Sequence, residues 1–243
     1  MENSVNQSVN YKIAMTGVLG ALSVVLSVTP LGYIQIPFIS ITVMHIPAIL
    51  AAVLAGLVPG MCVGLIFGVT SLVRTVIAGG GVNPFFLNPM VSILPRILFP
   101  AAAWAAYTLL TKVASMPRTL GASIAAAVGT LFNTLLVMGA IYIFYGNTLV
   151  KGMAETFIKF GFNFEITGLK GYFAVIAVME LTNGLWEIAG AVIITTAVMG
   201  AMFVSSKAKS RLSQYEEEEE EDKKIIDEIK NPSSTSDVEK IEE

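Results

Sequence analysis

Cysteine, histidine and charge are all scarce in most of this chain. A single cysteine, Cys62, leaves no pair for an internal disulfide. The only histidine, His45, has no Asp or Cys positioned near it, so the usual ligand set of a metal site is lacking. The chain also lacks the Gly-x-x-x-x-Gly-Lys-Ser/Thr phosphate loop, so any ATP hydrolysis would have to come from another protein. We therefore expect no metal and no cofactor.

Charged residues are few up to Val204 and dense after it. Eight basic and five acidic residues precede this point, and seven basic and thirteen acidic residues follow it, with an unbroken acidic run at 216–222. Such composition predicts a solvated, disordered tail. A short helix with Ile225, Ile226 and Ile229 on one face is the alternative. The predicted regions are a short polar N-terminus (1–10), a central domain (11–204) and an acidic tail (205–243).

Apolar residues dominate the region before the tail. They make up 54% of the whole chain, and the mean hydropathy is +0.72, which a water-soluble fold does not accommodate. A membrane helix needs about 20 mostly apolar residues. Cutting the apolar stretches at Pro, Gly and charge predicts an all-α integral membrane protein with six spans, at 11–29, 41–58, 60–78, 89–110, 120–145 and 171–204. Pro59-Gly60 is the expected turn between the second and third, and the first is expected to be a retained helix.

Basic residues near the ends of the spans predict the orientation, because positively charged loops tend to stay cytoplasmic. With the N-terminus inside, the cytoplasmic set is Lys12, Lys112, Arg118, Lys207, Lys209 and Arg211. Lys151, Lys159 and Lys170 then lie outside. Both termini are therefore predicted to be cytoplasmic, with external segments at 30–40, 79–88 and 146–170.

Ionisable residues inside the predicted spans are the first candidates for a binding site, because each is costly in a bilayer. Arg96 lies in the fourth span, and Glu180 and Glu187 lie seven residues apart on one face of the sixth, with Asn183 between them. Either Arg96 pairs with one of these glutamates or its planar guanidinium holds a ligand carboxylate, and the two roles are compatible.

Further candidates surround this charge. Asn133 and Trp186 are placed to line a pocket with apolar walls and a few polar anchors. The loop at 79–89 combines three glycines with Asn83 and Phe85, which suits either a hinged lid or an aromatic-anchored interfacial loop. Asn88-Pro89 has the pattern of a helix N-cap followed by proline. His45 would form a hydrogen bond in the pocket or to a neighbouring helix.

The first span has a different surface. Gly17 and Ala21 form a small-x-x-x-small pair, which allows another helix to approach closely. The pair serves either internal packing or docking of a partner.

Several of these stretches together resemble a known family. They are Ser40 to Pro47, Gly56 to Gly60, Gly64 to Ser71, Asn88-Pro89 and Leu94 to Leu98. The chain is similar here to the substrate-binding S components of energy-coupling factor (ECF) vitamin transporters, and the resemblance extends over 11–204.

This resemblance implies a six-helix subunit that binds one vitamin from outside and docks on a module of a transmembrane coupling protein and two ATPases. Gly17 and Ala21 match the spacing of the family's docking motif, although glycine replaces the first alanine. The family's pocket lies in its outer half, which agrees with the predicted positions of Asn83, Phe85, Arg96, Asn133, Asn183 and Trp186. Glu187 and His45 are the further candidates for substrate binding. The implied protein is a binder in a prokaryotic plasma membrane, with vitamin, module and lipid as partners and no nucleic acid.

Other functions are less favoured by the residues. A buried arginine favours a ligand with a carboxylate, which places pantothenate or folate ahead of other vitamins. A stand-alone carrier would use Glu180 or Glu187 to relay protons. An intramembrane enzyme would need paired acids with histidine or several histidines, and only His45 is present.

Overall fold

The structure is a computed structural model, and it describes residues 9–36, 39–77, 84–145 and 168–230. It divides into two compact units, Met1–Ala197 and Val198–Glu243. The first unit contains every candidate binding residue, and the boundary between the units falls within the last helix. Each unit is described by itself.

The first unit begins with helix α1 (Val9–Val28) and a small hairpin. After the 3-10 turn η1 (Pro30–Gly32), strand β1 (Tyr33–Ile36) pairs antiparallel with β2 (Ile39–Thr42). Isoleucine, tyrosine and threonine, which occupy six of the eight strand positions, favour extended backbone because their branched or aromatic side chains fit a pleated surface. The hairpin was not expected from the apolar pattern, which predicts helix from residue 41.

Helix α2 (Ile46–Ala55) is therefore shorter than predicted and covers only part of 41–58. Pro47 occupies its first turn, where the missing N–H costs nothing. It ends at Gly56, whose φ of 108° is a conformation that side chains disfavour. The turn before α3 (Leu57–Ile77) is thus at Gly56, and Pro59 and Gly60 lie in the first turn of α3, which corrects the predicted turn.

The predicted fourth span is a broken helix. It consists of α4 (Pro89–Ser92), α5 (Leu94–Thr108) and a π-helical end, η3 (Leu109–Val113), and the 3-10 turn η2 (Pro84–Leu87) precedes it. Asn88 caps α4 by accepting a hydrogen bond from the Met90 N–H at 3.0 Å. The predicted N-cap with proline at the first helical position is confirmed.

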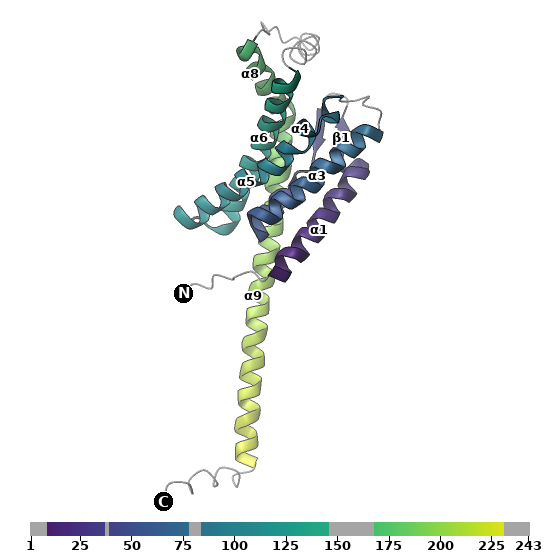
Figure 1. Cartoon of the computed structure of the whole chain (residues 1–243). Helices are drawn as coiled ribbons and strands as arrows, with labels where there is room; N and C mark the ends of the chain where they lie inside the picture. Colours follow the sequence, from purple (N-terminus) through teal and green to yellow (C-terminus); the bar gives the residue numbers. More distant parts are fainter. Residues whose placement is uncertain (1–8, 37–38, 78–83, 146–167, 231–243) are drawn as a thin grey trace, which may run out of the picture. The chain divides into compact units, whose positions relative to one another are not determined.

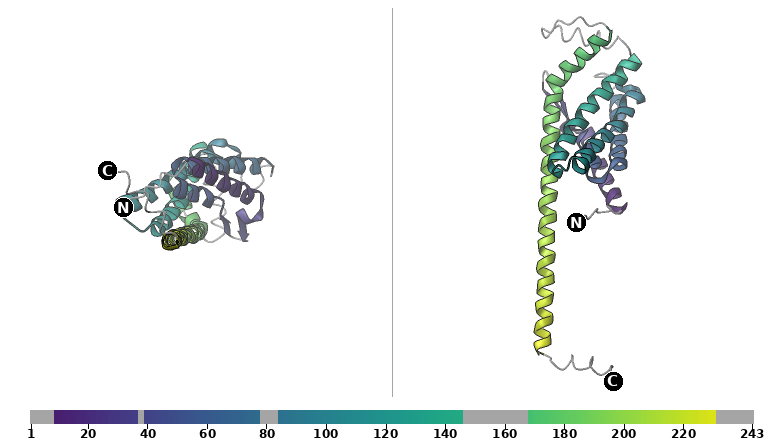
Figure 2. Two further views of the ribbon diagram at one scale, coloured as in Figure 1. Left: turned by 90° about the horizontal axis from the view of Figure 1, so that it is seen from below. Right: turned by 90° about the vertical axis from the view of Figure 1, so that its left-hand side faces the viewer.

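Four further helical segments follow, and the boundary between the units falls within the last of them. They are α6 (Arg118–Tyr145), α8 (Gly168–Met179), the π-helical segment η4 (Glu180–Gly184) and α9 (Leu185–Lys230). Figures 1 and 2 show α3 between α1 and α5, and α5 is in turn packed against α6. Helix α2 contacts α1, α3, α5 and α6, and all ten of its residues are buried. Helix α2 is therefore fully buried, although it is shorter than the apolar helices around it.

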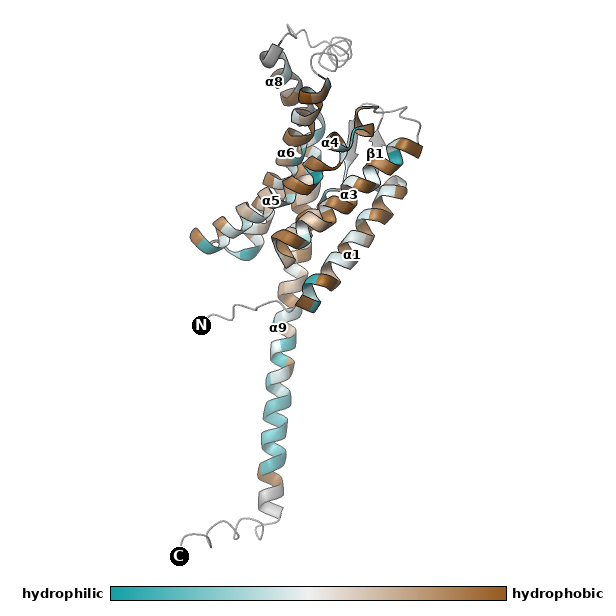
Figure 3. Cartoon of the chain, viewed as in Figure 1, coloured by the Kyte–Doolittle hydropathy of each residue, from teal (hydrophilic) through white to brown (hydrophobic). Residues whose placement is uncertain are grey.

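Five helices are long and apolar enough to cross a membrane within the described part of the chain. They are Val9–Val28, Leu57–Ile77, Pro89–Val113, Arg118–Tyr145 and Leu185–Ile226, with α2 as a shorter apolar helix. Many of their large apolar side chains are exposed, and Figure 3 shows long brown, hydrophobic stretches along the ribbons of α1 and α3. This is the arrangement expected where lipid replaces water. The chain is a multi-pass membrane protein.

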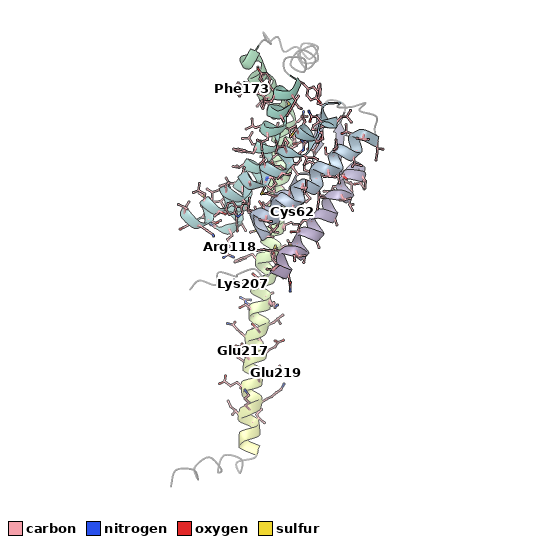
Figure 4. The ribbon with its side chains drawn as sticks, in the orientation of Figure 1. Cys62, Arg118, Phe173, Lys207, Glu217 and Glu219 are labelled. Carbon is pink, nitrogen blue, oxygen red and sulfur yellow. The ribbon has the colours of Figure 1, made fainter. Side chains whose placement is uncertain are left out.

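The tail differs from the predicted disorder as far as the structure describes it. Helix α9 continues to Lys230, through the acidic run, and its second half is coloured hydrophilic in Figure 3. The side chains of Glu217 and Glu219 project from it (Figure 4), and Lys223 forms an ion pair with Glu219 at 2.9 Å. Glutamate and lysine are good helix formers, and pairs four residues apart add support.

Candidate functional site

Six polar side chains of the first unit are buried or partly buried, and four of them form two hydrogen-bonded pairs, Thr42 with Glu187 and His45 with Thr130. We call them the polar cluster: Thr42, His45, Arg96, Thr130, Asn133 and Glu187. Thr42 is partly buried and the other five are buried. They come from β2, the start of α2, α5, α6 and α9, so the cluster joins five parts of the chain. Polar groups in an apolar interior need partners, and their contacts therefore report on what the site can bind.

The Arg96 side chain is oriented by a backbone carbonyl that a proline leaves without its helical hydrogen bond. Pro95 has no N–H, so the carbonyl of Val91, four residues earlier, lacks its usual helical donor. The Arg96 side chain supplies one instead, because its Nη1 donates to the Val91 oxygen at 2.8 Å. The break between α4 and α5 thus creates the acceptor that orients the guanidinium.

Two aromatic rings complete the surroundings of this guanidinium. Its central carbon lies 4.8 Å from the centre of the Phe86 ring and 5.5 Å from that of Phe67. Cations are attracted to the faces of aromatic rings, more strongly where water is excluded. Arg96 is only 6% exposed, so its charge is fixed in an apolar setting.

The backbone of Arg96 is closely covered by α3. Pro100 also lacks an N–H, so the Arg96 carbonyl has no helical donor four residues later. Gly64 packs against this carbonyl, and a Cβ at Gly64 would lie only 2.0 Å from the oxygen. Only glycine allows this approach, which places α3 directly against the arginine.

His45 and Thr130 connect α2 to α6. The Nε2 atom of His45 lies 3.1 Å from the Thr130 hydroxyl, which donates to the Ala126 carbonyl at 2.9 Å. His45 is completely buried. The predicted hydrogen bond of His45 to a neighbouring helix is therefore present.

Glu187 connects α9 to the hairpin. Its Oε1 atom accepts from the Thr42 N–H at 2.8 Å and from the Thr42 hydroxyl at 2.7 Å. Two hydrogen bonds to one carboxylate oxygen stabilise a charge that is 92% removed from solvent, since Glu187 is 8% exposed. The proposed pairing of Arg96 with Glu187 stays a prediction. The side chain of Glu180 is outside the described residues.

Asn133 lies one turn beyond Thr130 on the same face of α6. It is buried, and its Oδ1 atom has no hydrogen-bond partner among the described residues. The same holds for Nδ1 of His45. The cluster thus contains one buried cation and two buried polar atoms, Asn133 Oδ1 and His45 Nδ1, without a hydrogen-bond partner among the described residues.

The other predicted residues lie in varied places. The Phe85 ring packs edge-on against Tyr145, with centroids 4.9 Å apart, while its neighbour Phe86 contacts Arg96. Trp186 is 59% exposed and Asn183 is half-buried. Asn83 and the triple glycine lie outside the described residues. The binding roles of Asn83, Phe85, Asn183 and Trp186 stay predictions. The hinged lid also stays a prediction.

Gly17 and Ala21 lie on the outer face of α1. Both are exposed, whereas Leu19, Gly20 and Ser23 face the interior. A Cβ at Gly17 would meet no atom within 4 Å among the described residues. This face is accordingly not used for packing in the described part of the chain.

The comparison with known proteins identifies the family. Residues 11–199 match the family described as "ECF transporter, substrate-specific component". This chain belongs to that family. The S component is therefore a transport subunit and not an enzyme, and the predicted resemblance is confirmed.

A curated relative agrees with this assignment. The S component is 28% identical over 176 residues to the "Pantothenic acid transporter PanT" of Lactococcus lactis subsp. cremoris (strain MG1363), an alignment that covers 66% of this chain and 76% of the relative. Together the family and the relative support a substrate-binding subunit for vitamin uptake.

Sequence reasoning missed Thr42, Thr130, Phe67 and Phe86. Threonine and phenylalanine are common in membrane helices, so neither type is conspicuous there. One usable signal existed for Thr130, which stands three residues before Asn133 and thus on the same helical face. The approach of Gly64 to Arg96 also had a signal, since Gly60, Gly64 and Gly68 repeat the small-x-x-x-small spacing.

Proposed function

We propose that this S component binds pantothenate and delivers it to an ECF-type importer. The observation that carries the proposal is the buried guanidinium of Arg96, oriented by the Val91 carbonyl and two aromatic rings. A guanidinium fixed in an apolar setting suits bidentate binding of a carboxylate, and pantothenate has one. The name of the Lactococcus relative supports the same vitamin.

The polar cluster supports a ligand with more than a carboxylate. Beside Arg96 it contains His45, Thr130 and Asn133, each able to form hydrogen bonds. Pantothenate has an amide and two hydroxyl groups in addition to its carboxylate. Folate also has carboxylates and is the second candidate on charge, but its large aromatic ring system would need a flat apolar slot, and pantothenate does not.

The deciding experiment is a titration of the purified protein with pantothenate, folate, riboflavin, cobalamin and pyridoxine. We expect saturable binding of pantothenate in preference to the other four. Arg96→Ala should weaken binding at least about tenfold, the scale of a lost charged hydrogen bond. Arg74→Ala is the matched control, because Arg74 is an exposed arginine in the last turn of α3. Absence of saturable pantothenate binding to the wild-type protein would refute the proposal.

A double variant separates the two roles of Arg96. We expect Arg96→Ala combined with Glu187→Ala to regain the folded yield that the single arginine variant loses, without regaining affinity. Removing both charges avoids leaving one of them buried and uncompensated. If the single variant keeps its full affinity, Arg96 has only a structural role.

We further propose that transport requires a coupling protein and two ATPases in a prokaryotic plasma membrane, with both termini of the S component cytoplasmic. The exposed Gly17 and Ala21 provide a smooth helix face for docking. Uptake of labelled pantothenate in cells with and without the ATPases tests this directly. Full uptake without them would instead favour a stand-alone, proton-coupled carrier.

A further inference from the structure

The ring of His45 has a definite arrangement of hydrogens. The Thr130 hydroxyl has one hydrogen, and the Ala126 carbonyl oxygen, 2.9 Å away, can only accept it. A hydrogen donated to this carbonyl is not available to His45. The contact of 3.1 Å between this hydroxyl and His45 Nε2 is then a hydrogen bond only if Nε2 donates. Thr130 therefore selects the form of the imidazole with its hydrogen on Nε2.

The other ring nitrogen follows from this assignment. In a neutral imidazole one nitrogen donates and the other accepts. A doubly protonated ring would place an additional positive charge in a fully buried position, and burying an uncompensated charge is costly. Nδ1 of His45 is accordingly an acceptor. It is buried and has no hydrogen-bond partner among the described residues.

A second acceptor lies near the first. Asn133 follows Thr130 by three residues on the same face of α6, and its buried Oδ1 also has no partner among the described residues. Buried acceptors without donors are costly, and few occur in native proteins. Two of them in one cluster make the cluster a candidate for binding hydrogen-bond donors of a ligand.

We propose that His45 Nδ1 and Asn133 Oδ1 receive hydrogen bonds from hydroxyl groups of the ligand, and that Thr130 determines this specificity by setting the His45 tautomer. The inference rests on the proposed function and adds a rule to it. Arg96 binds the ligand's carboxylate, while His45 and Asn133 require donors on the rest of the molecule. An anion of similar shape without hydroxyl groups is rejected, because it leaves buried acceptors unsatisfied.

The tautomer can be measured directly, because His45 is the only histidine in the chain. Protein labelled with ¹⁵N-histidine and purified through a histidine-free tag gives signals from one imidazole. In the ligand-free protein we expect the hydrogen on Nε2 and none on Nδ1. Pantothenate should shift the Nδ1 resonance as it accepts a hydrogen bond. A hydrogen on Nδ1 in the ligand-free wild type would overturn the inference, whatever ligand the protein binds.

The specificity rule is tested with pantothenate and its dideoxy analogue, in which hydrogen replaces both hydroxyl groups and the carboxylate is kept. We expect the wild type to bind pantothenate at least about tenfold more tightly than the analogue. Thr130→Val, which keeps the shape but loses the hydroxyl, should reduce this ratio to about threefold or less. Thr130→Ser should preserve it, because serine retains the hydroxyl.

Ser23→Ala provides the control. Ser23 is buried in α1, and its hydroxyl also has no partner among the described residues, but it lies outside the polar cluster. The variant should leave the ratio unchanged. Equal affinities of the wild type for both compounds would overturn the specificity rule while the proposed function stands. If pantothenate does not bind at all, the proposed function fails, and the tautomer of the ligand-free ring still decides the assignment of His45.

Discussion

A single carboxylate oxygen of Glu187 accepts both the N–H and the hydroxyl of Thr42, 145 residues away in the chain. This pair fastens the start of α9 to the end of the hairpin. The hairpin leads directly into His45 and α2, so the same contact positions one side of the polar cluster. A buried glutamate that an apolar pattern marks as functional thus also has a structural partner.

Thr42→Val should destabilise the protein. Valine keeps the shape of threonine but removes the hydroxyl that donates to Glu187, and a hydrogen bond to a charged group contributes about 1.5–3 kcal/mol. We expect a lower unfolding temperature in detergent. Glu217→Gln, an exposed position in the acidic run of α9, is the control and should have no effect. Wild-type stability of Thr42→Val would show that the Glu187 contact is energetically unimportant.

Gly64→Ala should be strongly destabilising. The added Cβ would lie 2.0 Å from the Arg96 carbonyl oxygen, and relieving such a contact in a packed interior costs about 1–3 kcal/mol. Because α3 would be pushed from α5, affinity for pantothenate should fall as well. Gly17→Ala is the matched control, since its Cβ meets no described atom within 4 Å. Thermal unfolding and titration of both variants check this expectation, which normal behaviour of Gly64→Ala would contradict.

Phe86→Leu and Phe85→Leu should behave differently. The Phe86 ring lies 4.8 Å from the Arg96 guanidinium carbon, and a buried cation–π contact contributes about 0.5–2 kcal/mol. We expect Phe86→Leu to weaken pantothenate binding by about threefold to thirtyfold. Phe85→Leu loses the contact with Tyr145 and should mainly lower stability. The opposite ranking of affinities would place Phe85, and not Phe86, beside the ligand.

Removal of residues 213–243 should leave ligand binding intact. All members of the polar cluster lie within the unit Met1–Ala197, and the deletion keeps the basic residues at 207, 209 and 211 that follow the apolar part of α9. We expect an unchanged Kd, within the scatter of about twofold typical of distant surface changes. A large loss of affinity would show that the acidic helix contributes to the site.

Gly17→Leu tests the proposed docking face separately from binding. Gly17 is exposed on α1, so a larger side chain disturbs no described contact in the S component. We expect unchanged stability and pantothenate affinity, together with loss of co-purification with the coupling protein. Val18→Leu is the control, because it enlarges an exposed side chain next to Gly17 without changing the small-residue pair. Undiminished co-purification of Gly17→Leu would place the docking surface elsewhere.

The membrane character and most of the candidate residues were predictable from the amino-acid sequence. Runs of apolar residues long enough to cross a bilayer reveal the spans, and each polar residue inside them is conspicuous because its burial is costly. Arg96, His45, Asn133 and Glu187 were found in this way. The cap at Asn88 was also predictable, because it depends only on neighbouring residues.

The tertiary structure alone decided which of these residues meet and through what partners. His45 contacts a threonine 85 residues later, and Glu187 contacts one 145 residues earlier. The hairpin also shortened α2, and α9 continued through the acidic run. Hydropathy describes a residue's preference for lipid or water, but it contains no information about which helix faces meet. Those contacts, and hence the hydrogen on His45 Nε2 and the acceptor at Nδ1, follow only from the packing of distant segments.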